Sequence, residues 1–77
     1  MNTQGVWTPD PDSILAGEPT VYYRRTKAGY FVWISLRHDG TCDIWTTRDF
    51  EGNDHIDLAH CPSLHSAKLW ATKRFQF

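Results

Sequence analysis

Residues 30–48 read YFVWISLRHDGTCDIWTTR and contain two runs of β-branched and aromatic residues. The runs, residues 30–37 and 41–48, are separated by His-Asp-Gly, and Gly40 can supply the positive φ that a tight hairpin turn requires. Valine, isoleucine, threonine and the aromatic residues are the types enriched in strands. The segment therefore predicts an antiparallel hairpin.

The length of the turn decides which side chains share a face of this hairpin. A two-residue turn would pair Ile34 with Trp45 and mix aliphatic with aromatic side chains, because a shift of one residue exchanges the faces. A three-residue turn separates the two kinds, so we favour this register. Its pairs are Ile34 with Ile44, Trp33 with Trp45, Leu36 with Cys42 and Val32 with Thr46. The hairpin is expected to have one aliphatic and one aromatic face, and Val32, Ile34, Leu36 and Ile44 on the aliphatic face are expected to be nearly fully buried.

The flanking sequence extends the hairpin into a two-layer fold. Residues 21–26 form another strand-like run, followed by a turn that ends in Gly29. A two-residue turn at Ala28 and Gly29 would place Tyr22 and Arg24 on the aromatic face. Residues 55–59 alternate as a short fourth strand would. A helix then runs to about Phe75, with Ser63 as its cap and an apolar stripe along one side. We expect an α+β fold, an antiparallel three- to four-stranded meander packed by one C-terminal helix.

Residues 1–19 are punctuated by proline and glycine and are expected to form an N-terminal arm, followed by a single β-β-β-(β)-α domain over residues 20–77. Within the arm, Asp10 before a proline is typical of a helix start, and Gly17 would end that helix after about one turn. Three apolar residues are expected to dock the arm on the core, since an undocked arm would leave them in water. They are Trp7, Ile14 and Leu15.

The composition bounds the size and class of the protein. With 77 residues the chain has room for one domain, and we expect one complete small gene product. Its 14% aromatic content can fill the core of so small a domain. No run approaches the roughly 20 apolar residues of a membrane span, and the N-terminal residues lack the basic-then-apolar order of a signal peptide. We expect a cytoplasmic protein with reduced cysteines and no membrane partner.

The formal net charge is −1, which argues against a general nucleic-acid binder. The charges are nevertheless segregated along the chain. Residues 1–19 carry only acids, residues 20–37 only bases, and residues 38–60 are again mainly acidic. A charged partner should therefore meet one pole of the molecule.

The aromatic face of the meander is the expected binding surface, because a single helix can cover only the opposite face. A stripe of rings beside arginines suits a partner's side chains or bases. The competing possibility is that the N-terminal arm folds back and Trp7 covers the rings. The predicted contact residues are Tyr22, Arg24, Phe31, Trp33, Arg37 and Trp45.

All four histidines and both cysteines lie between residues 38 and 65, which raises the question of zinc. There is no CxxC knuckle, and Cys42 should face the core while His38 lies at a turn tip, so we expect no metal site. Cys61 lies just before a helix start with histidines beside it, an environment that activates thiols. So small a domain leaves little room for a substrate cleft, however. We expect no enzyme and no cofactor.

A meander followed by a helix that reads SLHSAKLWA over residues 63–71 resembles two groups of proteins. Over residues 20–75, its order resembles the three-strand-plus-helix DNA-binding domains of plant transcription factors and phage integrase arms. In length, lack of catalytic motifs and aromatic content, it is similar to small accessory proteins of phages and mobile elements, including anti-CRISPR and other host-inhibitor proteins. The second resemblance implies contact with a host protein complex.

The expected function is thus that of a small non-enzymatic binding protein that inhibits a host protein or protein complex by protein–protein contact. Nucleic-acid binding through the same face is the alternative. If that face stays uncovered, the chain is also expected to form a two-fold homodimer through it.

Overall fold

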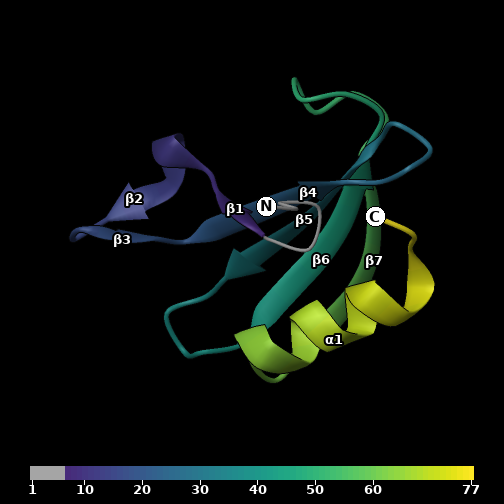
Figure 1. The fold of residues 1–77 in the computed structure, drawn as a ribbon. Coiled ribbons are helices and arrows are strands. Elements are labelled where there is room, and N and C mark those ends of the chain that lie inside the picture. The colour runs from purple at the N-terminus through teal and green to yellow at the C-terminus, as the bar shows by residue number, and fades with distance from the viewer. Residues whose placement is uncertain (1–6) are drawn as a thin grey trace, which may run out of the picture.

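The computed structural model describes residues 7–77 and shows an antiparallel sheet with one helix packed on one face (Figure 1). The sheet has five strands in the order β1-β4-β5-β6-β7, and β2 and β3 form a separate hairpin. The elements are β1 (Thr8–Pro9), the 3-10 helix η1 (Pro11–Ser13), β2 (Ile14–Leu15), β3 (Glu18–Pro19), β4 (Val21–Arg25), β5 (Phe31–Leu36), β6 (Cys42–Thr47), β7 (Ile56–Cys61) and α1 (Leu64–Arg74). The predicted α+β class is confirmed, and β1 adds an edge strand that the sequence did not indicate.

The central hairpin, β5 and β6, has the predicted register. Ile34 lies opposite Ile44 and Trp33 lies opposite Trp45. Gly40 adopts a φ of 89° in the turn, a conformation that costs glycine little because it has no Cβ. The aliphatic and aromatic side chains are therefore separated onto the two faces, as expected.

The register between β4 and β5 differs from the expectation. Tyr23 lies opposite Trp33, whereas Tyr22 lies opposite Ile34 and Arg24 opposite Val32. The cause is a three-residue turn in place of a two-residue one, closed by a 2.8 Å hydrogen bond from the Thr26 amide to the Tyr30 carbonyl. A shift of one residue turns every side chain of β4 over. The placement of Tyr22 and Arg24 on the aromatic face was therefore wrong, and Tyr23 takes their place.

The predicted fourth strand and the C-terminal helix are both present. β7 pairs with β6 along its length, with a bulge where the register shifts between Ile44 and Trp45. α1 begins after Ser63, whose side chain accepts a hydrogen bond from the Ser66 amide in a reciprocal capping box. Across residues 7–77, no helix has the length and apolar character needed to cross a bilayer.

The core lies between α1 and the aliphatic face of the sheet. Val32, Ile34 and Ile44 are fully buried against two alanines of the helix, Ala67 and Ala71. Alanine allows the helix axis to approach the sheet closely because it has only a methyl group to accommodate. Leu36, which was also expected to be buried, is only partly covered.

The arm docks through one of its three predicted anchors. Trp7 is buried on the helix side, where its ring lies 5.5 Å from Phe77. Asp10 caps the single turn η1 by accepting a hydrogen bond from the Asp12 amide, as predicted.

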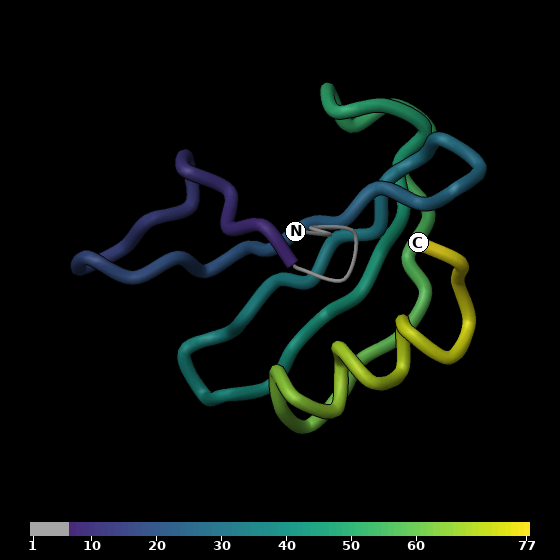
Figure 2. The backbone as a smooth tube through the Cα atoms, viewed as in Figure 1, coloured from purple at the N-terminus to yellow at the C-terminus, as the bar shows by residue number. Residues whose placement is uncertain are grey.

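Ile14 and Leu15, the other two predicted anchors, do not dock on the core. Ile14 and Leu15 form β2 in a hairpin that projects from the sheet (Figure 2), and they are 53% and 71% exposed. The prediction that they dock on the core was wrong, because the chain reverses direction at Ala16 and Gly17 before it returns to the sheet.

Candidate binding surfaces

The outer face of the sheet, opposite α1, carries a connected layer of rings. Trp33 lies at its centre, 5.2 Å from Tyr23, 5.4 Å from Phe50 and 6.3 Å from Trp45, with which it stacks at an angle of 6°. We define the aromatic layer as Tyr23, Phe31, Trp33, Trp45, Phe50 and His55. Edge-to-face and offset arrangements at these distances are favourable beyond the area they bury.

Phe50 covers the layer, and hydrogen bonds hold it there. The Trp33 indole Nε1 donates to Thr47 Oγ1 at 2.8 Å, and that hydroxyl donates to the Asp49 carbonyl at 2.7 Å. The β6–β7 loop is thereby drawn over the face, and only 6% of Trp33 remains exposed. The rings are thus covered in large part by one another and by Phe50, rather than by Trp7.

The six predicted contact residues fall into two groups on opposite faces. Four of them, Phe31, Trp33, Arg37 and Trp45, lie on the outer face as expected. The other two contact the helix side, where the Arg24 guanidinium lies 4.1 Å from the Phe77 ring and the Lys68 ammonium 5.2 Å from the Tyr22 ring. The sheet separates these groups, so one partner cannot engage all six through a single flat contact.

Beside the aromatic layer, the outer face ends in a chain of polar contacts across three strands. Arg37 Nε donates to Asp43 Oδ2 at 2.7 Å, and His60 Nδ1 lies 2.9 Å from Asp43 Oδ1. Hydrogen bonds from Arg37 and His60 lower the pKa of the Asp43 carboxyl. The Arg37 guanidinium is therefore paired with a carboxylate of the same chain.

An open groove of about 340 Å³ lies between the Arg37–Asp43 pair and the stacked rings of Trp45 and His55.

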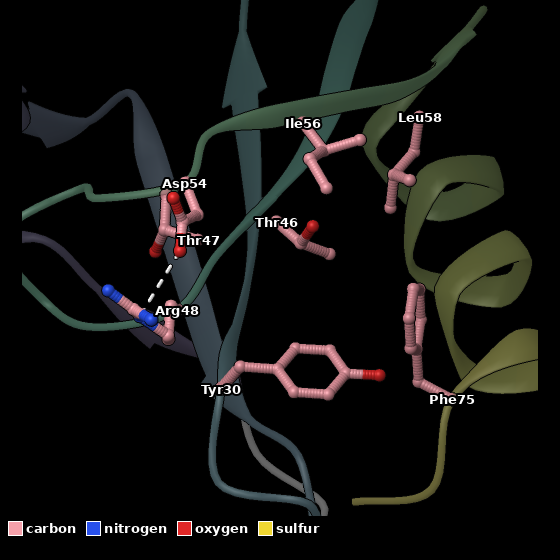
Figure 3. Close-up of a pocket in the computed structure, with 8 residues that line it drawn as sticks. All are labelled: Tyr30, Thr46, Thr47, Arg48, Asp54, Ile56, Leu58 and Phe75. Carbon is pink, nitrogen blue, oxygen red and sulfur yellow. Dashed lines mark ion pairs between the residues drawn. The ribbon is translucent and has the colours of Figure 1, made fainter.

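A second groove lies on the helix side of the sheet, near the C-terminal end of α1 (Figure 3). It encloses about 320 Å³ and is mainly apolar, and the Tyr30 ring points toward Phe75 at one side while Ile56 and Leu58 come from β7. An ion pair of 3.2 Å between Arg48 and Asp54 lies at its edge. The groove can accommodate an apolar group, but no cysteine or histidine lines it.

The β2–β3 hairpin is the surface that the sequence did not reveal. Ala16 and Gly17 at its tip have φ values of 53° and 85°, and positive φ at both central residues is characteristic of the type I′ turn of two-residue hairpins. Its apolar side chains, Ile14 and Leu15, point into solvent. In the sequence, only the Ala16-Gly17 pair could have indicated this hairpin. The same pair is equally typical of the end of a short helix, so the hairpin was missed.

Hydrogen bonds at its base hold the hairpin in place. The Ser13 hydroxyl donates to the Asp10 carbonyl at 2.7 Å and accepts from the Val21 amide at 3.0 Å. Thr20 Oγ1 donates to the Ser13 carbonyl at 2.7 Å, and the Leu36 amide donates to the Thr20 carbonyl at 2.7 Å. The hairpin is thereby joined to both β4 and β5.

The histidine, cysteine and acidic side chains that raised the question of zinc can be placed within residues 7–77. No three histidine, cysteine or acidic side chains of this segment are arranged to hold a metal ion. Cys42 and Cys61 are free thiols buried in the core. Comparison with protein-family models, curated proteins and solved structures found no match for this chain.

Proposed function

We propose that this chain is a non-enzymatic protein-binding protein and that the β2–β3 hairpin is its main contact element. The observation that carries the proposal is the exposure of two adjacent aliphatic side chains, Ile14 and Leu15, on an element that projects from the sheet (Figure 1). Exposed apolar side chains are typical of interaction sites when a surface element presents them together, and this hairpin presents one on each of its faces because neighbouring strand residues alternate. On a projecting hairpin, they can enter a concave surface of a partner.

The charge of the hairpin indicates the chemistry of that partner. The ionisable side chains between residues 7 and 20 are all acidic, namely Asp10, Asp12 and Glu18. A complementary surface would offer an apolar socket edged by lysine or arginine side chains. The bonds of Ser13 restrict the hairpin before it binds, which reduces the entropy lost on association.

A second contact area is proposed on the outer face. Trp45 and Phe31 are partly exposed there, Phe50 is 49% exposed, and Arg37 lines a groove together with Trp45. A partner that receives the hairpin tip could extend over this face. Inhibition of a host complex, as in phage and mobile-element accessory proteins, is the specific form of the proposal, and it is supported by length and aromatic content alone.

Nucleic-acid binding remains the alternative function, and two contacts weigh against it. Arg37 is paired with Asp43 at 2.7 Å, and Arg24 lies on the helix side rather than on the aromatic face. The outer face therefore holds less unbalanced positive charge than the sequence indicated. Phosphate contacts would give an affinity that falls steeply with salt, whereas a mainly apolar protein contact would not.

The test is site-specific photocrosslinking in cells that encode the protein, followed by binding measurements with the purified adduct partner. A photoreactive amino acid at Leu15 should give a discrete protein adduct. Leu15→Ser should then weaken binding to that partner at least about tenfold, in the range of interface residues that contribute most. Because Leu15 is largely exposed, the thermal midpoint should stay unchanged.

Leu69 provides a matched control. It is also an exposed leucine, on α1, with 49% of its surface accessible, so Leu69→Ser makes the same chemical change elsewhere. The hairpin assignment fails if Leu15→Ser and Leu69→Ser bind equally well. If Trp45→Ala alone abolishes binding, the outer face is the contact surface instead. Adducts with nucleic acid, and a steep loss of affinity with salt, would overturn protein binding altogether.

A further inference from the structure

The two cysteines of the chain lie directly opposite each other in the sheet. Cys42 in β6 and Cys61 at the end of β7 are Cα partners in the antiparallel register. They are the only cysteines in the sequence, and both are free thiols in the hydrophobic core. Directly opposed residues share a face of the sheet, so the two side chains extend to the same side.

This geometry is close to that of a disulfide. Opposed Cα atoms of an antiparallel pair are about 4.5 or 5.5 Å apart, depending on the type of pair. Disulfides span Cα separations of about 4.4–6.8 Å, so either type is suitable. The Cβ atoms of such pairs are about 4.5–5.5 Å apart, compared with about 3.5–4.5 Å in a disulfide. Closure therefore needs only a local approach of the two strands.

We propose that Cys42 and Cys61 form an oxidation site, at which a low-molecular-weight disulfide such as oxidised glutathione converts the two thiols into a reversible cross-strand disulfide. The inference is independent of the proposed function. No second cysteine pair competes for the reaction, because the sequence contains no other cysteine.

The reaction takes place in two exchange steps. Cys61 is the more accessible of the pair, and its thiolate attacks one sulfur of oxidised glutathione, which breaks the S–S bond and releases one glutathione. Cys42 then attacks Sγ of Cys61, forms the Cys42–Cys61 bond and releases the second glutathione. The protein loses two electrons and two protons, and one oxidised glutathione becomes two reduced molecules.

Two features shape the rate and the reversibility of this reaction. Burial raises the pKa of the Cys42 thiol, so little thiolate is present at neutral pH and the second step should be the slower one. Any approach of the Cβ atoms that closure requires would be stored as strain, and strained disulfides are more easily reduced than relaxed ones. The bond would link β6 to the point where β7 leads into α1, since Cys61 lies just before the cap Ser63.

The test uses the wild-type protein in glutathione buffers of increasing oxidised fraction, quenched with acid and analysed by intact mass and by alkylation of free thiols. The expected product is a monomer lighter by two hydrogens (about 2 Da) with no alkylatable thiol, and dithiothreitol should restore both thiols. Digestion should yield one linked peptide pair that contains Cys42 and Cys61.

Single variants identify the steps. Cys42→Ser should stop at the mixed disulfide of Cys61 with glutathione, because the second thiol is missing. The proposal is overturned if wild-type protein at equilibrium with oxidised glutathione alone keeps two alkylatable thiols. It is equally overturned if that protein accumulates only glutathione adducts or disulfide-linked dimers. None of these wild-type readings depends on whether a variant folds.

Discussion

At the scale of single residues, the indole of Trp33 links the neighbouring strands to the β6–β7 loop. Its ring contacts Tyr23, Trp45 and Phe50, and its N–H is bonded to the hydroxyl of Thr47, which in turn bonds the backbone of the loop. A buried indole N–H needs such a partner, because an unpaired buried donor loses its hydration without replacement. The Thr47 hydroxyl therefore helps to hold the β6–β7 loop, and with it Phe50, over the aromatic layer.

Replacing Thr47 with valine should destabilise the protein by about 1–3 kcal/mol, since the shape is kept but the indole N–H loses its acceptor. Thr47→Ser is the control, because it keeps the hydroxyl and loses only a methyl group, at a cost of about 1 kcal/mol. Chemical denaturation measures both costs. Exchange of the Trp33 indole proton should accelerate in Thr47→Val alone, and equal rates in the two variants would contradict this role.

Asp43 should make stability depend on pH. Its pKa is lowered in the folded protein by hydrogen bonds from Arg37 and His60, from an ordinary value of 3.8. A lowered folded-state pKa means that its stabilising contribution is present above the ordinary value. That contribution is lost as pH falls from there through the folded-state pKa.

The comparison is between wild type and Asp43→Asn in denaturation series at several pH values. Wild type should be the more stable above the ordinary carboxyl pKa, and the difference should shrink as pH falls through the lowered folded-state pKa, below which the carboxyl is protonated in both states. A difference that stays constant over this range would show that the charge of Asp43 does not contribute.

At the scale of elements, the β2–β3 hairpin depends on its base rather than on packing. Its two apolar side chains are exposed, so its position relies on the hydrogen bonds of Ser13 and Thr20. β7, by contrast, lies at the open edge of the sheet and carries a bulge, a feature that discourages further strands from pairing with an edge. These facts favour contact through the hairpin over contact through the edge.

Ser13→Ala should loosen the hairpin without unfolding the sheet. The Val21 amide loses its acceptor, so its hydrogen exchange should become at least about tenfold faster, as for a locally opening segment. Amides of β5 and β6 serve as internal controls and should keep their protection. Unchanged exchange at Val21 would mean that the hairpin is held by other contacts.

At the scale of the whole molecule, the small core makes stability sensitive to every buried side chain. The largest fully buried side chains are those of Ile34, Ile44, Val32 and Cys42. Domains of this size bury a smaller share of their surface than larger ones and have little stability in reserve. Both cysteine side chains are part of this small core, so they contribute to the buried surface that stabilises the fold.

Ile34→Ala should cost about 2–5 kcal/mol, the sum of lost burial and an unfilled cavity, which is a large share of the stability of such a domain. Ile34→Val removes one methyl group and should cost only about 0.5–1.5 kcal/mol. Urea denaturation measures the loss of stability in both variants, provided that the unfolding free energy depends on urea concentration with the same slope as in wild type. A loss below about 0.5 kcal/mol for the alanine variant would contradict the central place of Ile34 in the core.

The sequence by itself determined the features that depend on near neighbours. Alternation along residues 30–48 and the turn ending in Gly40 define the β5–β6 register, and the serine cap defines the start of α1. These signals are local, because a turn or a cap is made by residues a few positions apart. The fold class and the aliphatic core could be predicted for that reason.

Only the tertiary structure decided which of these surfaces are free. The turn at Thr26 and Tyr30 turned β4 over and moved Arg24 to the helix side, which a one-residue change in loop length is enough to do. Phe50 covered Trp33, and the reversal at Ala16 carried Leu15 away from the core. Strand alternation assigns a side chain to a face, but its exposure depends on segments that return from far along the chain.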